Sequence, residues 1–172
     1  IALGYAAMSA CVSGIDNIAL GTNSMDALTS GACNLALGSN ALGAMTVGAL
    51  NIAIGRDAMS GYTTQQADGN IGIGIGALTG GSTSSGEDNV AIGTSTMDAI
   101  TTGASNVAMG INAAGALTTG GNNVAIGTTA LGGVVTGANN VAIGQAAADA
   151  VTSGACNIAM GINALGAATI AT

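Results

Sequence analysis

One motif recurs along the whole chain of 172 residues: Asn, an apolar residue, Ala, a second apolar residue, and Gly. Successive copies lie 17 residues apart, except for two consecutive units of 19 residues. The units begin at Asn17, Asn34, Asn51, Asn70, Asn89, Asn106, Asn123, Asn140 and Asn157. A fixed period of this length is typical of proteins that stack one small structural unit many times.

The motif also accounts for the beginning of the chain, because Ile1 to Gly4 matches the end of an incomplete first unit. We therefore interpret residues 1–172 as a single repeat domain. Because the chain begins inside a unit and without Met, we expect it to be a segment or a processed form of a longer chain.

A single unit, residues 123–139, shows how each coil is built. Val124 and Ile126 alternate with Ala125, which is the period of a short strand, and Gly127 ends that strand. Two further apolar patches follow, at 130–131 and 134. So small a unit cannot bury a core alone, but a stack of units can. We predict an all-β protein, a parallel β-solenoid (β-roll or β-helix) of about ten coils of 17 to 19 residues.

The composition excludes several classes of function. Arg56 is the only basic residue against 8 acidic ones, so the chain lacks the cationic surface that binds nucleic acid or an anionic membrane. Gly, Asn, Ser or Thr interrupts every apolar run, which excludes a membrane-spanning helix. With no His and no Lys, the hydroxyl groups have no obvious base to activate them. We predict no enzymatic activity, no cofactor and no metal.

Two columns of the stack are invariant or nearly so. Gly occupies the fifth position of all ten units, from Gly4 to Gly161, which predicts a positive φ or a backbone neighbour too close for a Cβ. The Asn that opens each unit predicts a structural ladder of stacked side-chain amides, each hydrogen-bonded to the coils above and below.

The third position of the unit holds Ala in nine units and Gly72 in the other. If the flanking apolar residues point into the solenoid, this column points outward, and a surface restricted to methyl groups predicts close packing against another copy of the chain. The predicted oligomer interface is Ala19, Ala36, Ala53, Ala91, Ala108, Ala125, Ala142 and Ala159. The alternative is a roll so thin that both faces of the strand are internal.

The string NxAxG, as in 106–110 and 140–144, extended to NxAxGxxAL at 123–131 and followed by TGANN at 136–140, resembles the head repeats of trimeric autotransporter adhesins. It is also similar to the longer NTAIG-type repeats of bacteriophage tail fibres and other appendages. The resemblance implies a homotrimer of parallel β-rolls, left-handed in the adhesin heads, that acts as an extracellular shaft or attachment surface. The unit of 17 residues is longer than the adhesin repeat, and the resemblance leaves open whether a virus or a cell makes the protein.

The remaining chemical signals are weak. The Gly-rich stretch 70–76 is the repeat with an additional Gly rather than a dinucleotide fingerprint, since no βαβ unit surrounds it. The acidic residues are scattered over the coils and indicate a solvated surface. Cys33 and Cys156 share a column seven coils apart, beyond disulfide reach, and Cys11 takes a core position equivalent to Leu28.

A column of Thr residues raises a different class of function, because ice-binding proteins present regular rows of hydroxyl groups. The column comprises Thr29, Thr46, Thr63, Thr101, Thr118, Thr152 and Thr169. Ice binding usually uses two parallel columns on one face, whereas the neighbouring hydroxyl residues here are adjacent in sequence and tend to face opposite ways. Ice binding is therefore the less favoured reading.

The two 19-residue units place their additional residues within 61–68 and 80–88, and we expect one local bulge there. Tyr62, Glu87 and Asp88 belong to it and Arg56 lies nearby, so these four residues are candidates for a lateral contact with a neighbouring fibre, a cell-surface glycan or a receptor. A bulge without function is the alternative.

These observations predict a non-enzymatic structural protein, either a shaft or an attachment module outside the cell or on a virion. The main alternative is a secreted subunit that polymerises head to tail into an extracellular filament, because open coil edges invite stacking. The predicted partners are further copies of the chain, in a homotrimer or end to end, and a glycan or receptor.

Overall fold

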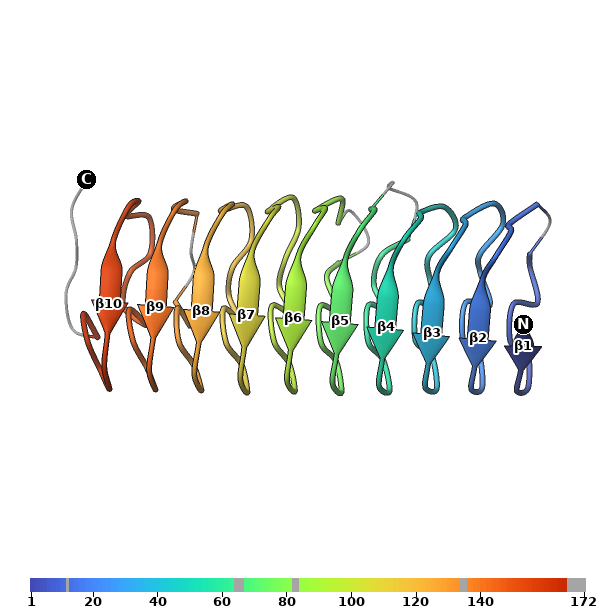
Figure 1. Ribbon diagram of the computed structural model, residues 1–172, viewed down its shortest axis with the longest axis horizontal. Helices are drawn as coiled ribbons and strands as arrows, with labels where there is room; N and C mark the ends of the chain where they lie inside the picture. Colours follow the sequence, from blue (N-terminus) through green and yellow to red (C-terminus); the bar gives the residue numbers. More distant parts are fainter. Residues whose placement is uncertain (12, 64–66, 82–83, 134–135, 167–172) are drawn as a thin grey trace.

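The computed structural model describes residues 1–11, 13–63, 67–81, 84–133 and 136–166. The chain winds into a β-solenoid in which each coil contributes one short strand to a single parallel sheet (Figure 1). The strands are β1 (Ala2–Leu3), β2 (Ile18–Leu20), β3 (Leu35–Leu37), β4 (Ile52–Ile54), β5 (Ile71–Ile73), β6 (Val90–Ile92), β7 (Val107–Met109), β8 (Val124–Ile126), β9 (Val141–Ile143) and β10 (Ile158–Met160). The predicted all-β parallel β-solenoid is confirmed.

Strand order in the sheet follows chain order from β1 to β10, and every pair is parallel. The register places each motif position opposite its equivalent, so that Ala108 faces Ala125 and Val107 faces Val124 across the β7–β8 pair. This strict register also holds across the two 19-residue units, where Ile52 pairs with Ile71 and Ile71 with Val90. The two additional residues of each 19-residue unit therefore lie outside the sheet. Residues 64–66 and 82–83 of those units lie outside the described residues.

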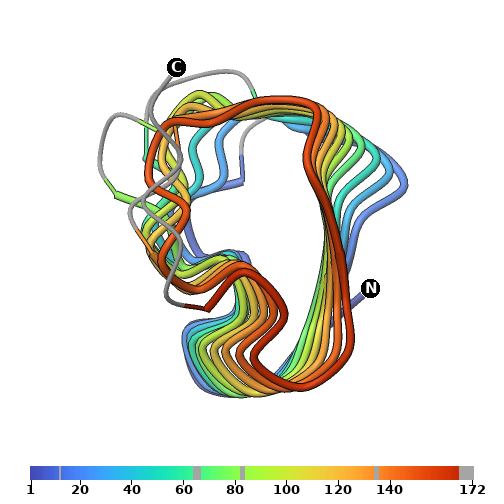
Figure 2. The same cartoon turned by 90° about the vertical axis from the view of Figure 1, so that its left-hand side faces the viewer.

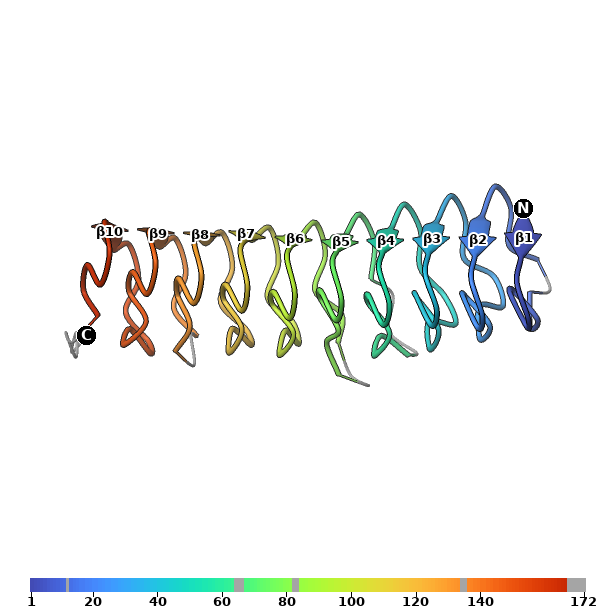
Figure 3. The ribbon, with the colours of Figure 1, turned by 90° about the horizontal axis from the view of Figure 1, so that it is seen from below.

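The sheet forms one straight wall of the coil, and tight turns form the others (Figures 2 and 3). After β3, for example, Ala41 N–H donates to Gly38 O and Gly43 N–H to Asn40 O, two consecutive four-residue turns. The third residues of these turns, Asn40 and Leu42, have φ of 59° and 52°. A positive φ at this position is the hallmark of a type II turn. The second apolar patch of the unit is thus a pair of turns rather than a second strand.

The Gly that ends each strand has both a positive φ and a close backbone neighbour, the two features predicted from its invariance. Gly127 has a φ of +133°, and a Cβ added to it would lie 2.5 Å from the carbonyl oxygen of Gly144 in the next coil. The ten equivalent glycines all have φ between 119° and 141°. A side chain at this column would therefore be strained by the backbone and, at Gly127, would also clash with the neighbouring coil.

The interior of the solenoid is narrow and filled by small and medium apolar side chains. Side chains from the turn wall, such as Met59 and Leu78, reach across to the inner face of the sheet. A Cβ built on Gly72, in the middle of β5, would lie 3.0 Å from Met59 Cγ and 3.4 Å from Leu78 Cβ. The distance between the two walls therefore leaves room for about a methyl group on the inner face of each strand.

This geometry overturns the predicted direction of the alanine column. These alanines point into the solenoid and are 0 to 2% exposed within a single chain. The residues concerned are Ala19, Ala36, Ala53, Ala91, Ala108, Ala125, Ala142 and Ala159. Their small size follows from the narrow interior and not from the approach of a second chain. The roll is thin, as the alternative interpretation held, but only one face of each strand is fully internal.

Candidate functional site

The most distinctive surface of the molecule is the outward face of the sheet, here called the outer face. It consists of the two motif positions that flank the alanine, and all of its members are Ile, Leu, Val or Met. The first column holds Ile18, Leu35, Ile52, Ile71, Val90, Val107, Val124, Val141 and Ile158, and the second holds Leu20, Leu37, Ile54, Ile73, Ile92, Met109, Ile126, Ile143 and Met160.

These side chains are only partly covered by the protein itself. Ile126 is 37% exposed and Met109 41% exposed, although both lie in the middle or second half of the sheet with strands on either side. Ten strands at about 4.8 Å spacing, each about 10 Å long, give a face on the order of 480 Å². A contiguous, partly exposed apolar face of about that extent is often a contact surface on a protein.

Two edges of mixed polar and apolar residues border the outer face. The leading edge comprises the two residues before each motif Asn, and the trailing edge comprises the two residues after each strand-ending Gly. The leading edge carries Asp16, Asp68, Glu87 and Asp88. The trailing edge carries Arg56 and Asp57, which form an ion pair with Nε 3.4 Å from Oδ2. Half of the eight carboxylates thus lie on the leading edge, and the single guanidinium lies on the opposite one.

The asparagine column forms a continuous hydrogen-bonded ladder beneath the leading edge. In a typical step, Asn123 donates its backbone N–H (2.9 Å) and its Nδ2 (3.0 Å) to Asn106 Oδ1. Asn123 Nδ2 also donates to Gly137 O, at the end of the same coil, over 3.1 Å. The buried members of the ladder are Asn17, Asn34, Asn51, Asn70, Asn89, Asn106, Asn123 and Asn140, and the partly buried Asn157 continues it. Each amide thus closes its own coil and joins it to the next, which is a structural role.

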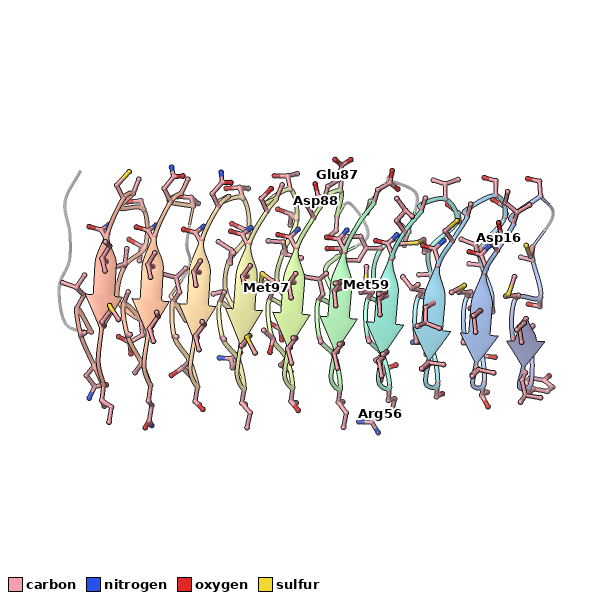
Figure 4. The ribbon with its side chains drawn as sticks, viewed as in Figure 1. Asp16, Arg56, Met59, Glu87, Asp88 and Met97 are labelled. Atoms are coloured by element: carbon pink, nitrogen blue, oxygen red, sulfur yellow. The ribbon has the colours of Figure 1, made fainter. Side chains whose placement is uncertain are left out.

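The four residues predicted to share a lateral contact are not brought together. Tyr62 is 0% exposed and occupies the core column of Leu28 and Met45. Its ring fits because the next coil has Gly80 beside it, where a Cβ would lie 2.8 Å from Tyr62 Cε2. Glu87 and Asp88 lie at the leading edge and Arg56 at the trailing edge (Figure 4). Tyr62 therefore offers no surface contact, and Arg56 lies on the other edge from Glu87 and Asp88. The predicted bulge itself falls in part on residues 64–66 and 82–83, outside the described residues.

The Tyr62 phenol is unusual for a core side chain because its hydroxyl is buried without a hydrogen-bond partner among the described residues. Burial raises the pKa of Tyr62 well above the ordinary value of a phenol. A polar hydrogen buried without a partner destabilises the folded chain, so this residue is neither a surface contact nor a favourable core residue.

Two further acidic residues, Asp26 and Asp98, lie away from both edges of the outer face. Asp26 and Asp98 share a column but lie in coils far apart along the rod. Burial raises the pKa of the Asp98 carboxyl above its ordinary value, and a backbone hydrogen bond lowers it in part. Within the described ranges, no group of three acidic, Cys or His side chains is arranged to hold a metal ion.

The threonine column uses its hydroxyl groups within the stack. Thr29 Oγ1 donates to Thr46 O (2.9 Å), Thr46 Oγ1 to Thr63 O (2.8 Å), and Thr101 Oγ1 to Thr118 O (3.0 Å). Hydroxyl groups that donate their proton to the next coil have no donor left for a ligand or for ice. Thr169 lies outside the described residues.

The three cysteines are free thiols. Cys33 and Cys156 are exposed on the leading edge, and Cys11 is partly buried in the core column. Val134, at the equivalent position of a later coil, lies outside the described part of the chain. No described segment is a helix with the length and hydropathy needed to cross a lipid bilayer.

Comparisons of the chain with protein-family models, with curated proteins and with solved structures find no match. The candidate site therefore depends on the geometry described above. Sequence reasoning missed the outer face because strict alternation fits either assignment of the two strand faces. The signal that could have found it is the absence of any polar residue from both flanking columns over the full set of coils.

Proposed function

We propose that the protein is a non-enzymatic structural module of an extracellular or virion-surface fibre, in which copies of the rod associate laterally through their outer faces. The observation that carries this proposal is the continuous, partly exposed and exclusively apolar outer face. A chain exposing such a face gains free energy by covering it, and the repeated register makes a second copy with the same spacing a complementary surface.

The assembly we propose is a homotrimer around an axis parallel to the rod, with left-handed coils. The resemblance to the adhesin and phage-appendage repeats supports three copies. The size of the outer face supports lateral association in general, because two faces of about 480 Å² bury on the order of 1,000 Å², close to the lower limit for a specific interface. Parallel rods keep equivalent coils level with each other along the whole length.

The mechanical role follows from the backbone. Inter-strand hydrogen bonds, the asparagine ladder and the threonine hydroxyls all run along the rod and connect each coil to the next. Force applied along the axis is therefore shared among several bonds at each step. Such a rod suits a shaft or an attachment surface, and a glycan or receptor remains the proposed external partner.

The test measures the molar mass of the complete chain by light scattering and its shape by small-angle X-ray scattering. We expect three copies in a compact bundle one rod long. Ile126→Glu places a charge on the outer face and should yield folded monomers. Thr119→Glu, an exposed site outside that face, should leave the mass unchanged. A wild-type chain that stays monomeric at every concentration would contradict the proposal, and open-ended filaments would favour the head-to-tail alternative.

A further inference from the structure

The charges that border the outer face are distributed unequally between its two edges. The leading edge has four carboxylates and no cation, and the trailing edge has Arg56 with Asp57. Figure 4 shows Arg56 at one edge of the sheet, and Glu87, Asp88 and Asp16 at the other. A three-residue strand separates the edges within one coil, so Arg56 has no access to the leading-edge carboxylates of its own chain.

Arg56 has unused capacity for a partner. Its side chain is 66% exposed, and its ion pair with Asp57 involves Nε at 3.4 Å. Asp57 Oδ1 also accepts a hydrogen bond from Asn40 Nδ2 at 2.9 Å, which holds that carboxylate against its own coil. An exposed pair of this kind contributes little stability, and guanidinium presents five N–H groups in a planar fork. The terminal nitrogens can therefore bind a further carboxylate.

Glu87 and Asp88 have the complementary properties. Both are exposed, and their backbone groups are fixed because Asp88 N–H donates to Asp68 O and Ser105 N–H donates to Glu87 O. Arg56–Asp57 is the only ion pair among the described residues. These two carboxylates are adjacent in sequence and are held on a rigid turn at the border of the apolar face.

We propose that Arg56 on the trailing edge of one copy pairs with Glu87 and Asp88 on the leading edge of the next copy, and that this pairing sets the direction and stagger of neighbouring rods. Rotation about an axis parallel to the rod brings the trailing edge of one copy to the leading edge of its neighbour. A two-fold axis along the strands instead opposes two leading edges, with four carboxylates on each side, and like charges in contact oppose association.

The positions along the rod agree with this arrangement. Arg56 directly follows β4, Asp68 precedes β5, and Glu87 and Asp88 precede β6. The charged groups of the two edges are therefore separated by one to two coils of about 4.8 Å each. With equivalent coils level, Arg56 lies one coil from Asp68 and two coils, about 10 Å, from Glu87 and Asp88, a step that the extended arginine and glutamate side chains span together. Sliding one rod by several coils separates the charges. The apolar columns repeat at every coil and do not by themselves distinguish one stagger from another.

This inference rests on the proposed lateral association, and charge-swap variants separate the two. Arg56→Glu should weaken self-association on the order of tenfold at low salt, measured by sedimentation equilibrium. The double variant Glu87→Arg, Asp88→Arg should weaken it similarly, and the triple variant with all three changes should restore it. Thr128→Glu, in the same trailing-edge column four coils away, is the control and should have a smaller effect.

A second measurement, disulfide cross-linking, tests directly which edges of neighbouring copies face each other. Ser39→Cys introduces a thiol on the trailing edge at the level of the native leading-edge Cys33. Treatment with a disulfide-forming oxidant should link residue 39 of one chain to Cys33 of another, identified by mass spectrometry of the linked peptides. Links between Cys33 and Cys156 of different chains would instead show antiparallel rods and overturn the proposal.

The remaining outcomes are also decisive. If Arg56→Glu leaves association unchanged while Ile126→Glu abolishes it, the charge pairing is wrong and the lateral association stands. If the triple swap fails to recover what the separate swaps lose, the specific pairing is again wrong. A wild-type chain that never associates removes the proposed function and this inference together.

Discussion

The two faces of the sheet differ sharply although they alternate along the same three-residue strands. The inner face is Ala or Gly at every coil and is sealed against the turn wall, with Ala125 only 1% exposed. The outer face carries Ile, Leu, Val and Met, and the neighbouring Ile126 is 37% exposed. The larger apolar side chains of the strand are thus on the outside and the smallest on the inside, the reverse of the usual expectation.

The difference shows that the size of the inward-facing side chains in this solenoid is set by the distance between the sheet and the opposite turns. Met59 and Leu78 project from the turn wall and occupy the interior, so the sheet contributes only methyl groups. The branched residues pack against their counterparts in adjacent coils and leave an apolar surface. The outer face therefore contains the branched residues that strands favour, and a second molecule would be needed to bury it.

The largest expected effect comes from placing the same charge on the two faces. Ala125→Glu buries a carboxylate in a space that fits a methyl group and should destabilise the chain by more than about 4 kcal/mol. Ile126→Glu should leave the stability of the isolated rod within about 1 kcal/mol, because its side chain reaches water. Urea unfolding followed by circular dichroism compares them. Equal losses of stability at both sites would show that the two faces are not distinct.

A second effect tests the end of the strand. Gly127→Ala adds a Cβ where φ is +133° and where the Gly144 carbonyl oxygen is 2.5 Å away, and should cost about 3 kcal/mol. Gly81→Ala is the matched control, because among the described residues its Cβ would meet nothing nearer than Ser84 Oγ at 4.0 Å and its φ is not in the positive region. A Gly127→Ala chain as stable as the control would mean that the coils can separate at this column at little cost.

The asparagine ladder should be the next most sensitive feature. Asn123→Ala leaves the buried Gly137 C=O of its own coil and the buried Asn140 N–H of the next coil without their side-chain partners and should cost about 2 to 3 kcal/mol. Asn122→Ala changes the adjacent exposed residue, whose φ of 58° is unfavourable for Ala, and should cost about 1 kcal/mol. Thermal unfolding of the pair measures the difference, and a smaller loss at Asn123 than at Asn122 would exclude a structural ladder.

The smallest effect concerns the core and has the opposite sign. Tyr62→Phe removes a buried hydroxyl without a partner and should stabilise the chain by about 1 kcal/mol at neutral pH. Because burial raises the pKa of Tyr62, the folded state keeps the proton that the unfolded state loses near pH 10, so wild-type stability should fall as the pH rises above about 10.

The Tyr62→Phe variant should lose less stability above pH 10 than the wild type. The control Tyr5→Phe, at an exposed tyrosine, should change neither the stability at neutral pH nor its decline at high pH. Urea titrations at pH 8 and pH 11 make the comparison. A Tyr62→Phe chain that is less stable than the wild type would show that the hydroxyl has a favourable interaction in solution.

Several features could be predicted from the sequence because they depend on the backbone and recur at a fixed spacing. The period of 17 to 19 residues led to a stacked β-solenoid, and the invariant Gly column led to a positive φ and a close neighbour, both of which are observed at Gly127. The period of two around Ala125 located the strand. These inferences concern local conformation and repetition, which the order of residues determines directly.

The candidate site depended on distances across the coil, and these were not accessible from the order of residues. Alternation states that Ala125 and Ile126 face opposite ways but not which of them faces inward. The order of residues places Tyr62 within the 61–68 segment of a longer unit and so predicts a surface position, yet the small Gly80 in the next coil admits its ring to the core. Arg56 and Glu87 are near each other in the repeat order but lie on opposite edges of the sheet.

The sequence by itself therefore determined the repeat, the strands and the turns at glycine. The tertiary structure decided which face of the strand is the core and how charge is divided between the two edges. The physical reason is that the core of a solenoid is defined by the separation of its walls. That separation arises only when the turns bring Met59 and Leu78 against the inner face of the sheet.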